Sequence, residues 1–252
     1  MAPAFQLADV GAAQLALIGA VALAASILGG LAGYGTGLVV PIFLAPLVGV
    51  ANVVPVMAVG MLFANASRVA AFRHDLRWPY VWRVLATGLP ACVAGAYGYT
   101  LLAPRWIALL LGAFFIASVP LRRLLARAGW RLGERGVLAA GAGFGFINGG
   151  MTGVGLLLVS TLMAAGLQGA ALIGTDAVVS MAMGLAKVAL FGSVSRLDAQ
   201  LAAAGVLIGL ATAPGAFVAR RLLAVVPLHV HTAFMDVVVL AGGASFLWRA
   251  FA

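Results

Sequence analysis

Two oppositely charged side chains, Asp176 and Lys187, interrupt a long apolar stretch of the sequence. They lie eleven residues apart, which is close to three turns of an α-helix, so a single helix would place them on one side. If this helix crosses a membrane, an ionisable group inside it is costly and suggests a function. We expect Lys187 to attract an anion, and Asp176 to pair with it or carry a proton. The structural alternatives are that Lys187 reaches an interface and that Asp176 caps a helix beside Thr175.

Two glycine-dense stretches offer a second kind of chemistry: GGLAGYGTGLVVP (29–41) and GFGFINGGMTGVGLLLV (143–159). A helix broken inside a membrane is tolerated only where protein or a water-filled cavity satisfies its backbone groups. The helix that starts after each break would present free N–H donors and a partial positive charge, which attract anions, and glycine lets a ligand approach the backbone. Close helix packing is the alternative role of such glycines.

The sequence therefore predicts a small-anion site between the two breaks, to which threonine hydroxyls and an asparagine amide add donors. The predicted binding residues are Gly33, Tyr34, Gly35, Thr36, Gly37, Asn148, Gly149, Thr152, Gly153, Gly155, Lys187 and Arg68, with Asp176 as the candidate for coupling. Neither break is a nucleotide-binding motif, because no strand precedes it and no Gly-Lys-Ser/Thr follows.

The elements that must position these residues form an internal repeat. A shift of 118 residues lays residues 35–38 over residues 153–156. Further on, and allowing gaps, RVAAFRHDLRW (68–78) meets KVALFGSVSRLD (187–198), so Arg68 is the rough equivalent of Lys187. Arg68 can equally be a charge that orients the chain. Repeat one covers about 11–121, an Arg-rich link covers 122–135, and repeat two covers about 136–250.

Each repeat is predicted to contain five helical pieces. A full span needs about 20 residues, and three of the pieces that flank the glycine breaks are shorter. The predicted pieces are 11–32, 37–50, 53–72, 80–102 and 105–121 in the first half, and 136–150, 154–168, 170–191, 199–219 and 228–248 in the second.

Composition identifies the class of protein. Of 252 residues, 64% are hydrophobic and 8% are charged, whereas soluble domains have about 25% charged residues. The apolar runs lack the alternation of a membrane barrel strand, so helices must satisfy the backbone. We predict an all-α integral membrane protein with one membrane domain, in which each repeat is a short glycine-broken helical hairpin followed by three transmembrane helices.

The net charge of +9 comes from basic residues at the ends of apolar runs. Such residues orient and anchor spans, so they do not indicate a nucleic-acid partner. Parallel and inverted repeats distribute these charges equally well between the two sides. The short pieces favour inversion, because the two at 136–150 and 154–168 contribute an even number of passes. Inverted repeats with interrupted helices are typical of secondary transporters.

The remaining polar residues are few and scattered. Asp236 either pairs with an arginine or serves as a coupling site, and the histidines at 74, 229 and 231 are expected near interfaces rather than on a metal. Six acidic residues and three histidines provide no cluster for acid–base or metal chemistry. We expect neither an enzyme nor a bound cofactor.

Three segments resemble the sulfite exporter TauE/SafE family of bacterial membrane proteins: GGLAGYGTGLVVPIFLAPLVGV (29–50), FINGGMTGVGLLLVSTLMAAGL (146–167) and LIGTDAVVSMAMGLAKVALFG (172–192). The resemblance implies transport, usually outward, of small sulfur-containing anions such as sulfite or organosulfonates across the inner membrane. Two other interpretations remain open at this point: a passive small-anion channel and a membrane assembly factor that transports nothing. The sequence leaves open the anion, the direction, the coupling ion and whether the chain forms a homo-oligomer.

Overall fold

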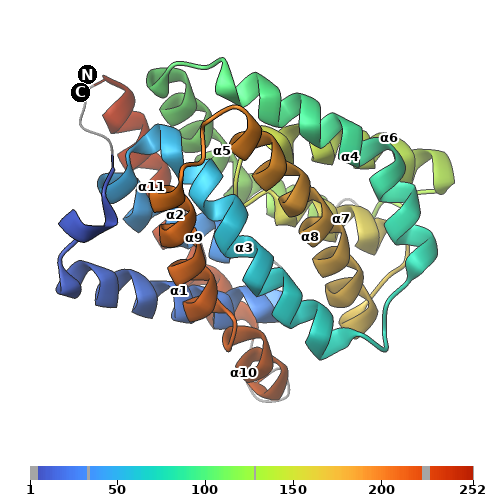
Figure 1. Ribbon diagram of the computed structural model, residues 1–252. Coiled ribbons are helices and arrows are strands. Elements are labelled where there is room, and N and C mark those ends of the chain that lie inside the picture. The colour runs from blue at the N-terminus through green and yellow to red at the C-terminus, as the bar shows by residue number, and fades with distance from the viewer. Residues whose placement is uncertain (1–4, 33–34, 128, 223–227, 252) are drawn as a thin grey trace.

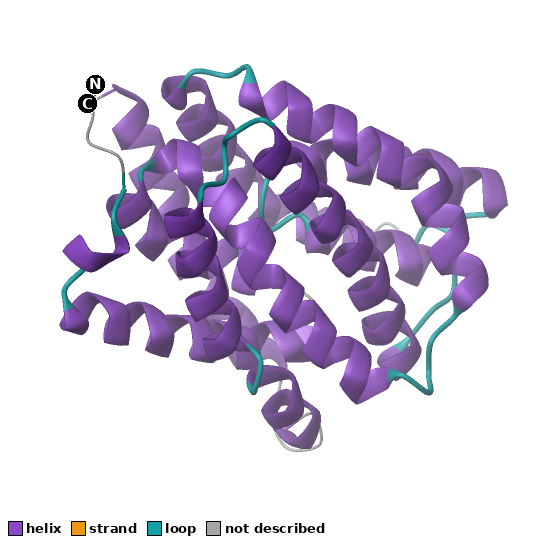
Figure 2. Ribbon diagram, viewed as in Figure 1, coloured by secondary structure: helices purple, strands orange, loops and turns teal. Residues whose placement is uncertain are grey.

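A computed structural model describes residues 5–32, 35–127, 129–222 and 228–251. These residues form helices joined by short loops, and no strand occurs among them (Figures 1 and 2). The helices are, in chain order, the short 3₁₀ helix η1 (Leu7–Asp9), α1 (Ala12–Ala32), α2 (Thr36–Val48), α3 (Val50–Phe72), α4 (Trp78–Thr100), α5 (Pro104–Arg127), α6 (Glu134–Gly150), α7 (Gly155–Ala164), α8 (Gly169–Ser193), α9 (Ala199–Thr212), α10 (Gly215–Leu222) and α11 (Leu228–Phe251).

The two helices that follow the glycine breaks, α2 and α7, are both delimited by glycines in left-handed conformations. Helix α2 lies between Gly35 (φ 139°) and Gly49 (φ 78°), and α7 lies between Gly153 (φ 78°) and Gly166 (φ 95°). Glycine adopts positive φ without the steric penalty of a side chain. The glycine-dense stretches therefore break the backbone where the sequence predicts that they do.

The predicted pieces agree with the observed helices to within four residues at each end, except in two places. The piece expected at 199–219 is two helices, because Pro214 lies between α9 and α10 and cannot continue the ladder of backbone hydrogen bonds. Helix α5 continues to Arg127 rather than ending at residue 121. Part of the Arg-rich link is thus helical and carries Arg122 and Arg123 into the packed structure.

If α1 to α5 correspond in order to α6, α7, α8, α9 with α10, and α11, the contacts between helices occur in equivalent pairs. Helix α4 packs on α6 and α8, while α9 packs on α1 and α3, and α10 also packs on α1 and α3. Helix α5 contacts α7, and α11 contacts α2. Two further pairs, α3 with α8 and α5 with α11, join corresponding helices directly. Helices at corresponding positions of the two predicted repeats therefore have corresponding neighbours.

The corresponding helices α3 and α8 run antiparallel. A Cβ added at Gly174, near the start of α8, would contact Phe72 at the end of α3, whereas one at Gly184 would contact Leu62 and Ala58. Helices α5 and α11 are also antiparallel, since Ile116 contacts Gly243 whereas Arg122 reaches back to Asp236.

Glycine allows the backbones of α4 and α6 to approach very closely. A Cβ at Gly145 would overlap the carbonyl of Gly88, and one at Gly149 would overlap the carbonyl of Cys92. Small residues at helix contacts are typical of membrane bundles, in which packing replaces the hydrophobic effect between helices. Gly149, a predicted binding residue, stands at this helix contact.

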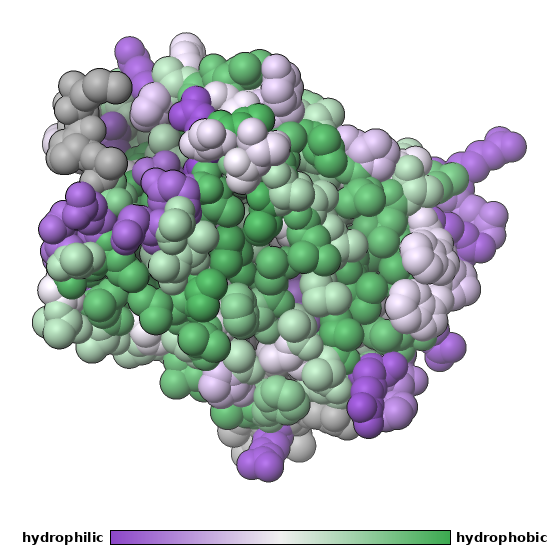
Figure 3. Space-filling model, viewed as in Figure 1, coloured by the Kyte–Doolittle hydropathy of each residue, from purple (hydrophilic) through white to green (hydrophobic). Residues whose placement is uncertain are grey.

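The outer surface suits a bilayer. Apolar residues cover most of the face shown in Figure 3, and the strongly hydrophilic residues lie mainly at its margins. Within the described part of the chain, four helical segments are long and apolar enough to cross a membrane: Val50–Phe72, Pro104–Leu125, Gly169–Ser193 and Ala199–Ala219, the last of which combines α9 with the start of α10. The fold is that of a multi-pass helical membrane protein, as the composition predicts.

Candidate functional site

A cavity of about 70 Å³, lined by polar and apolar residues, lies where the two glycine breaks meet, between α1, α2, α3, α6, α7 and α8. The predicted site residues that line it are Gly35, Thr36, Gly37, Arg68, Asn148, Thr152, Gly153, Gly155, Asp176 and Lys187. About 10–15 Å³ of such space accommodates one water molecule. The cavity therefore has room for several waters or for a small ion.

The two breaks contact each other through their backbones. The Thr152 hydroxyl donates a hydrogen bond to the carbonyl of Gly37 at 3.0 Å. A Cβ added at Gly37 would come within 2.7 Å of the Gly153 nitrogen, and one at Gly153 would come within 2.8 Å of the Gly37 oxygen. The absence of side chains at both positions thus brings the starts of α2 and α7 to the same cavity. The first N–H groups of a helix have no partner within the helix, so both starts can contribute donors.

The two threonine hydroxyls have structural partners. Thr36, the first residue of α2, donates to the carbonyl of Ala25 in α1 at 3.1 Å, and Thr152 donates to Gly37. Both side chains are buried. We expected these hydroxyls to offer protons to a ligand, but in this arrangement their protons hold the two breaks in place, and their oxygens remain available as acceptors.

Lys187 is buried, and its Nζ donates a hydrogen bond to the carbonyl of Asn148 at 3.0 Å. The alternative in which Lys187 reaches an interface is therefore wrong. The amide of Asn148 faces weak acceptors, the sulfurs of Met183 at 3.6 Å and Cys92 at 3.9 Å. The ammonium group thus lies beside the end of α6 and lines the cavity.

Asp176 forms an ion pair with Arg68 rather than with Lys187. Arg68 Nη1 lies 2.9 Å from Asp176 Oδ2, and the two side chains are 8% and 1% exposed. Eleven residues along α8 correspond to about 16 Å between Cα atoms, which is too far for Asp176 to reach Lys187. Arg68 also donates to Asn65 Oδ1. The expected pairing within α8 is thus replaced by a pairing between α3 and α8.

The second oxygen of this carboxylate, Asp176 Oδ1, is buried and has no hydrogen-bond partner among the described residues. A buried polar atom without a partner costs roughly 1–3 kcal/mol, and more when it is charged. Such an atom in a native site calls for an explanation, which here can be a ligand or water in the cavity. The alternative in which Asp176 serves only as a helix cap does not fit this position, well inside α8.

Three predicted residues remain to be placed, and the structure describes one of them. Gly33 and Tyr34 lie outside the described residues. Gly149 faces α4, at the crossing described above, and does not line the cavity.

The cavity also contains residues that the sequence reasoning missed, among them Ser26, Asn65, Phe144 and Ser180. For two of these residues, helical spacing from a predicted site residue would have indicated that they face the cavity. Asn65 precedes Arg68 by three residues and Ser180 follows Asp176 by four, and helical residues at these spacings share a face. Ser26 and Phe144 carry no comparable signal.

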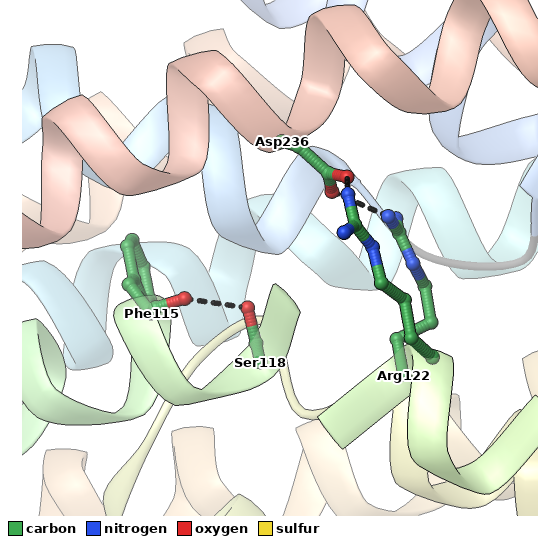
Figure 4. Close-up of polar contacts among 5 residues, drawn as sticks. Phe115, Ser118, Arg122 and Asp236 are labelled. Carbon is green, nitrogen blue, oxygen red and sulfur yellow. Dashed lines mark hydrogen bonds and ion pairs between the residues drawn. The ribbon is translucent and has the colours of Figure 1, made fainter. Parts of the chain in front are cut away.

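Asp236 belongs to a separate cluster between α5 and α11. Its two carboxylate oxygens accept from Arg122 and Arg123, the latter at 2.8 Å (Figure 4). On the same face of α5, Ser118 donates to the carbonyl of Phe115 at 2.7 Å. Of the two roles considered for Asp236, the geometry matches the arginine pair. A space of about 10 Å³ beside this cluster is lined by Leu38 and Leu156, so the cluster adjoins the first turns of α2 and α7.

No group of three or more metal-binding side chains occurs in the described ranges. The side chains of the histidines at 229 and 231 are outside those ranges, and His74 lies at the end of α3 beside Arg73, whose Nε donates to it at 3.0 Å.

The apolar helical bundle, with a cavity between its helices, defines a multi-pass membrane protein. The family model described as sulfite exporter TauE/SafE matches residues 18–246, so the chain belongs to this family of membrane transporters. No curated protein and no solved structure matches the chain.

Proposed function

We propose that this protein is a secondary transporter that exports small sulfur-containing anions, such as sulfite or organosulfonates, across the bacterial inner membrane. The anion binds in the central cavity, held by the first turns of α2 and α7 and by the ammonium group of Lys187. The observation that carries this proposal is the convergence of both short-helix starts and Lys187 on one buried cavity.

The arrangement of the helices supports an inverted repeat. Corresponding helices make corresponding contacts, and the pairs α3–α8 and α5–α11 run antiparallel. A two-fold axis in the plane of the membrane would produce both features. In transporters of this kind the substrate binds near the middle of the bilayer at the interface between repeats, and the cavity lies between α3 and α8, which belong to different repeats.

Export of an anion is energetically favourable when the cytoplasmic side of the membrane is electrically negative. Each 100 mV contributes about 2.3 kcal/mol per elementary charge, and this contribution drives an anion outward. Export therefore needs a selective, saturable path and no nucleotide hydrolysis. Asp176, with one unpaired oxygen in the cavity, is our candidate for coupling to protons.

The test is anion flux into proteoliposomes that contain the purified protein. Sulfite, sulfoacetate, taurine, sulfate and acetate are offered with and without a proton gradient. Wild-type protein should show saturable flux of sulfite or a sulfonate, and Lys187→Ala should abolish it. Arg131→Gln, which removes a positive charge from an exposed residue, is the matched control and should behave as wild type.

The same assay separates the rival functions. Flux that rises linearly with concentration and shows no counterflow would indicate a channel. Absence of flux for every anion, with folding verified by a cooperative thermal transition, would contradict transport and favour an assembly factor. Flux unchanged in Lys187→Ala would reject the site while retaining the function.

A further inference from the structure

The charges on the cavity wall do not balance. Among the described residues that line it, the ionisable side chains are Arg68, Asp176 and Lys187. Arg68 and Asp176 form an ion pair, whereas Lys187 has an uncharged partner, the carbonyl of Asn148. With all three groups ionised, the wall carries one net positive charge.

The helix ends add hydrogen-bond donors but little net charge. A helix N-terminus is equivalent to roughly half a positive charge, and a C-terminus to roughly half a negative charge. The starts of α2 and α7 line the cavity, and α6 contributes Asn148 near its C-terminus. Helix α1 ends at Ala32 and α2 starts at Thr36, while α6 ends at Gly150 and α7 starts at Gly155. Since helix ends carry partial charges of both signs, the formal charge of the wall is set by its side chains, among which Lys187 is the one whose described partner is uncharged.

We propose that the cavity selects singly charged anions over doubly charged ones, and that Asp176 sets this limit. This inference rests on the proposed transport function and specifies its substrate class. One negative charge on the ligand neutralises the site. A second one would be buried without compensation, and in addition it would face the unpaired Oδ1 of Asp176.

The size of the effect follows from Coulomb's law. Asp176 and Lys187 are about 16 Å apart along α8, so an anion near Lys187 lies on the order of 10 Å from the Asp176 carboxylate. At an effective dielectric constant of about 20, removing that carboxylate strengthens binding of a monovalent anion roughly 15-fold. The same removal strengthens binding of a divalent anion by the square of this factor, roughly 200-fold. Removal of Asp176 should therefore shift selectivity roughly 15-fold toward the divalent anion.

Two sulfonates of similar size and different charge provide the probe. Isethionate carries one negative charge at neutral pH, and sulfoacetate carries two. Each is titrated as a competitor of labelled sulfite uptake in proteoliposomes, and the ratio of their inhibition constants gives the charge selectivity. Wild-type protein should bind isethionate more tightly. Asp176→Asn should move the ratio roughly 15-fold toward sulfoacetate.

A second variant separates charge from shape. Arg68→Gln combined with Asp176→Asn removes both members of the ion pair and restores the net charge of the wall to that of wild type. Its selectivity ratio should therefore return to the wild-type value, although it carries the same substitution at position 176.

The outcomes are distinct. Absence of saturable uptake of every anion by wild type would overturn the proposed function. Uptake with wild-type inhibition constants that favour sulfoacetate would overturn the inference while leaving transport in place. The inference is also overturned if the Arg68/Asp176 double variant keeps the ratio of Asp176→Asn, because selectivity would then follow the residue and not the net charge. If Asp176→Asn does not fold, the wild-type ratio and the Arg68/Asp176 double variant decide the question.

Discussion

Two buried acidic residues in this protein have arginine partners, yet they differ in how completely they are satisfied. Both carboxylate oxygens of Asp236 accept from arginines, beside a space of about 10 Å³. Asp176 has one oxygen paired with Arg68 and the other without a partner in the described structure, beside a cavity of about 70 Å³. The same residue types can thus fasten two helices together or leave a site incomplete, and the unpaired atom and the open space distinguish the two cases.

The most severe test of this comparison replaces each carboxylate with an amide. Asp236→Asn leaves two arginines without a counter-charge, and breaking a buried pair costs about 3 kcal/mol or more. We place the loss near 3 kcal/mol because Arg123 is 63% exposed. Asp176→Asn also removes the counter-charge of a buried arginine, Arg68, but it eliminates the unpaired charged oxygen of Asp176; because these two effects offset each other in part, its cost should be smaller.

The measurement is the midpoint of thermal unfolding in detergent, together with flux by the folded protein. Asp236→Asn should lower the midpoint more and leave anion selectivity unchanged. Asp176→Asn should lower the midpoint less and change anion selectivity. Equal destabilisation with equal changes in selectivity would remove the distinction between the two acids.

The second prediction concerns adjacent glycines at the end of α6. Gly149→Ala should destabilise the protein by about 1–3 kcal/mol through overpacking, because the added methyl group would overlap the backbone of α4. Gly150→Ala is the matched control, since its methyl group would meet the Gly95 oxygen at 3.4 Å, an ordinary contact. The check is the difference between their unfolding midpoints. Loss of flux in Gly149→Ala without loss of stability would assign Gly149 to the binding site after all.

A third substitution acts at the contact between the two breaks. Gly37→Ala should lower flux at least tenfold and cost roughly 1–2 kcal/mol of stability, because its methyl group presses on the backbone of Gly153. Gly19→Ala is the control, since nothing lies within 4 Å of a Cβ there; in the middle of α1 it should be neutral or stabilise by roughly 0.5–1 kcal/mol. Initial rates of sulfite uptake compare the two. Normal uptake by Gly37→Ala would show that the breaks need not touch for transport.

The smallest effect is expected at the protein surface. Arg83 pairs with Glu134, but the two side chains are 35% and 74% exposed. Arg83→Gln should change stability by less than about 1 kcal/mol, as exposed ion pairs usually do, and should not change flux. A loss approaching that of Asp236→Asn would mean that burial is not what separates strong from weak pairs in this protein.

The sequence predicts helix positions well because glycine and hydrophobic runs act locally. Consecutive residues alone predict the breaks at Gly35 and Gly153 and the short helices that follow them. The split at Pro214 follows from the missing N–H of proline, but this rule alone would not have located it, because α2, α3, α4 and α5 each continue through an internal proline.

The pairing of the charges could not be predicted in the same way. Arg68 and Asp176 are 108 positions apart in the chain, and their meeting depends on how α3 and α8 cross. The periodicity of α8 correctly places Asp176 and Lys187 on one cavity, but helical rise makes them too distant to pair. Gly149 was assigned to the site because it belongs to the glycine-dense stretch. It packs instead on α4, whose contacting residues lie more than fifty positions away in the chain, so the sequence did not indicate this contact.

The chain contains a single lysine, Lys187, and it lines the buried cavity. No other side chain has a primary amine, so an amine-reactive reagent that modifies a side chain of the native protein must have entered the cavity. Reagents applied from one side of a sealed vesicle would therefore report which side the cavity faces, and protection by a bound anion would measure occupancy without any engineered label.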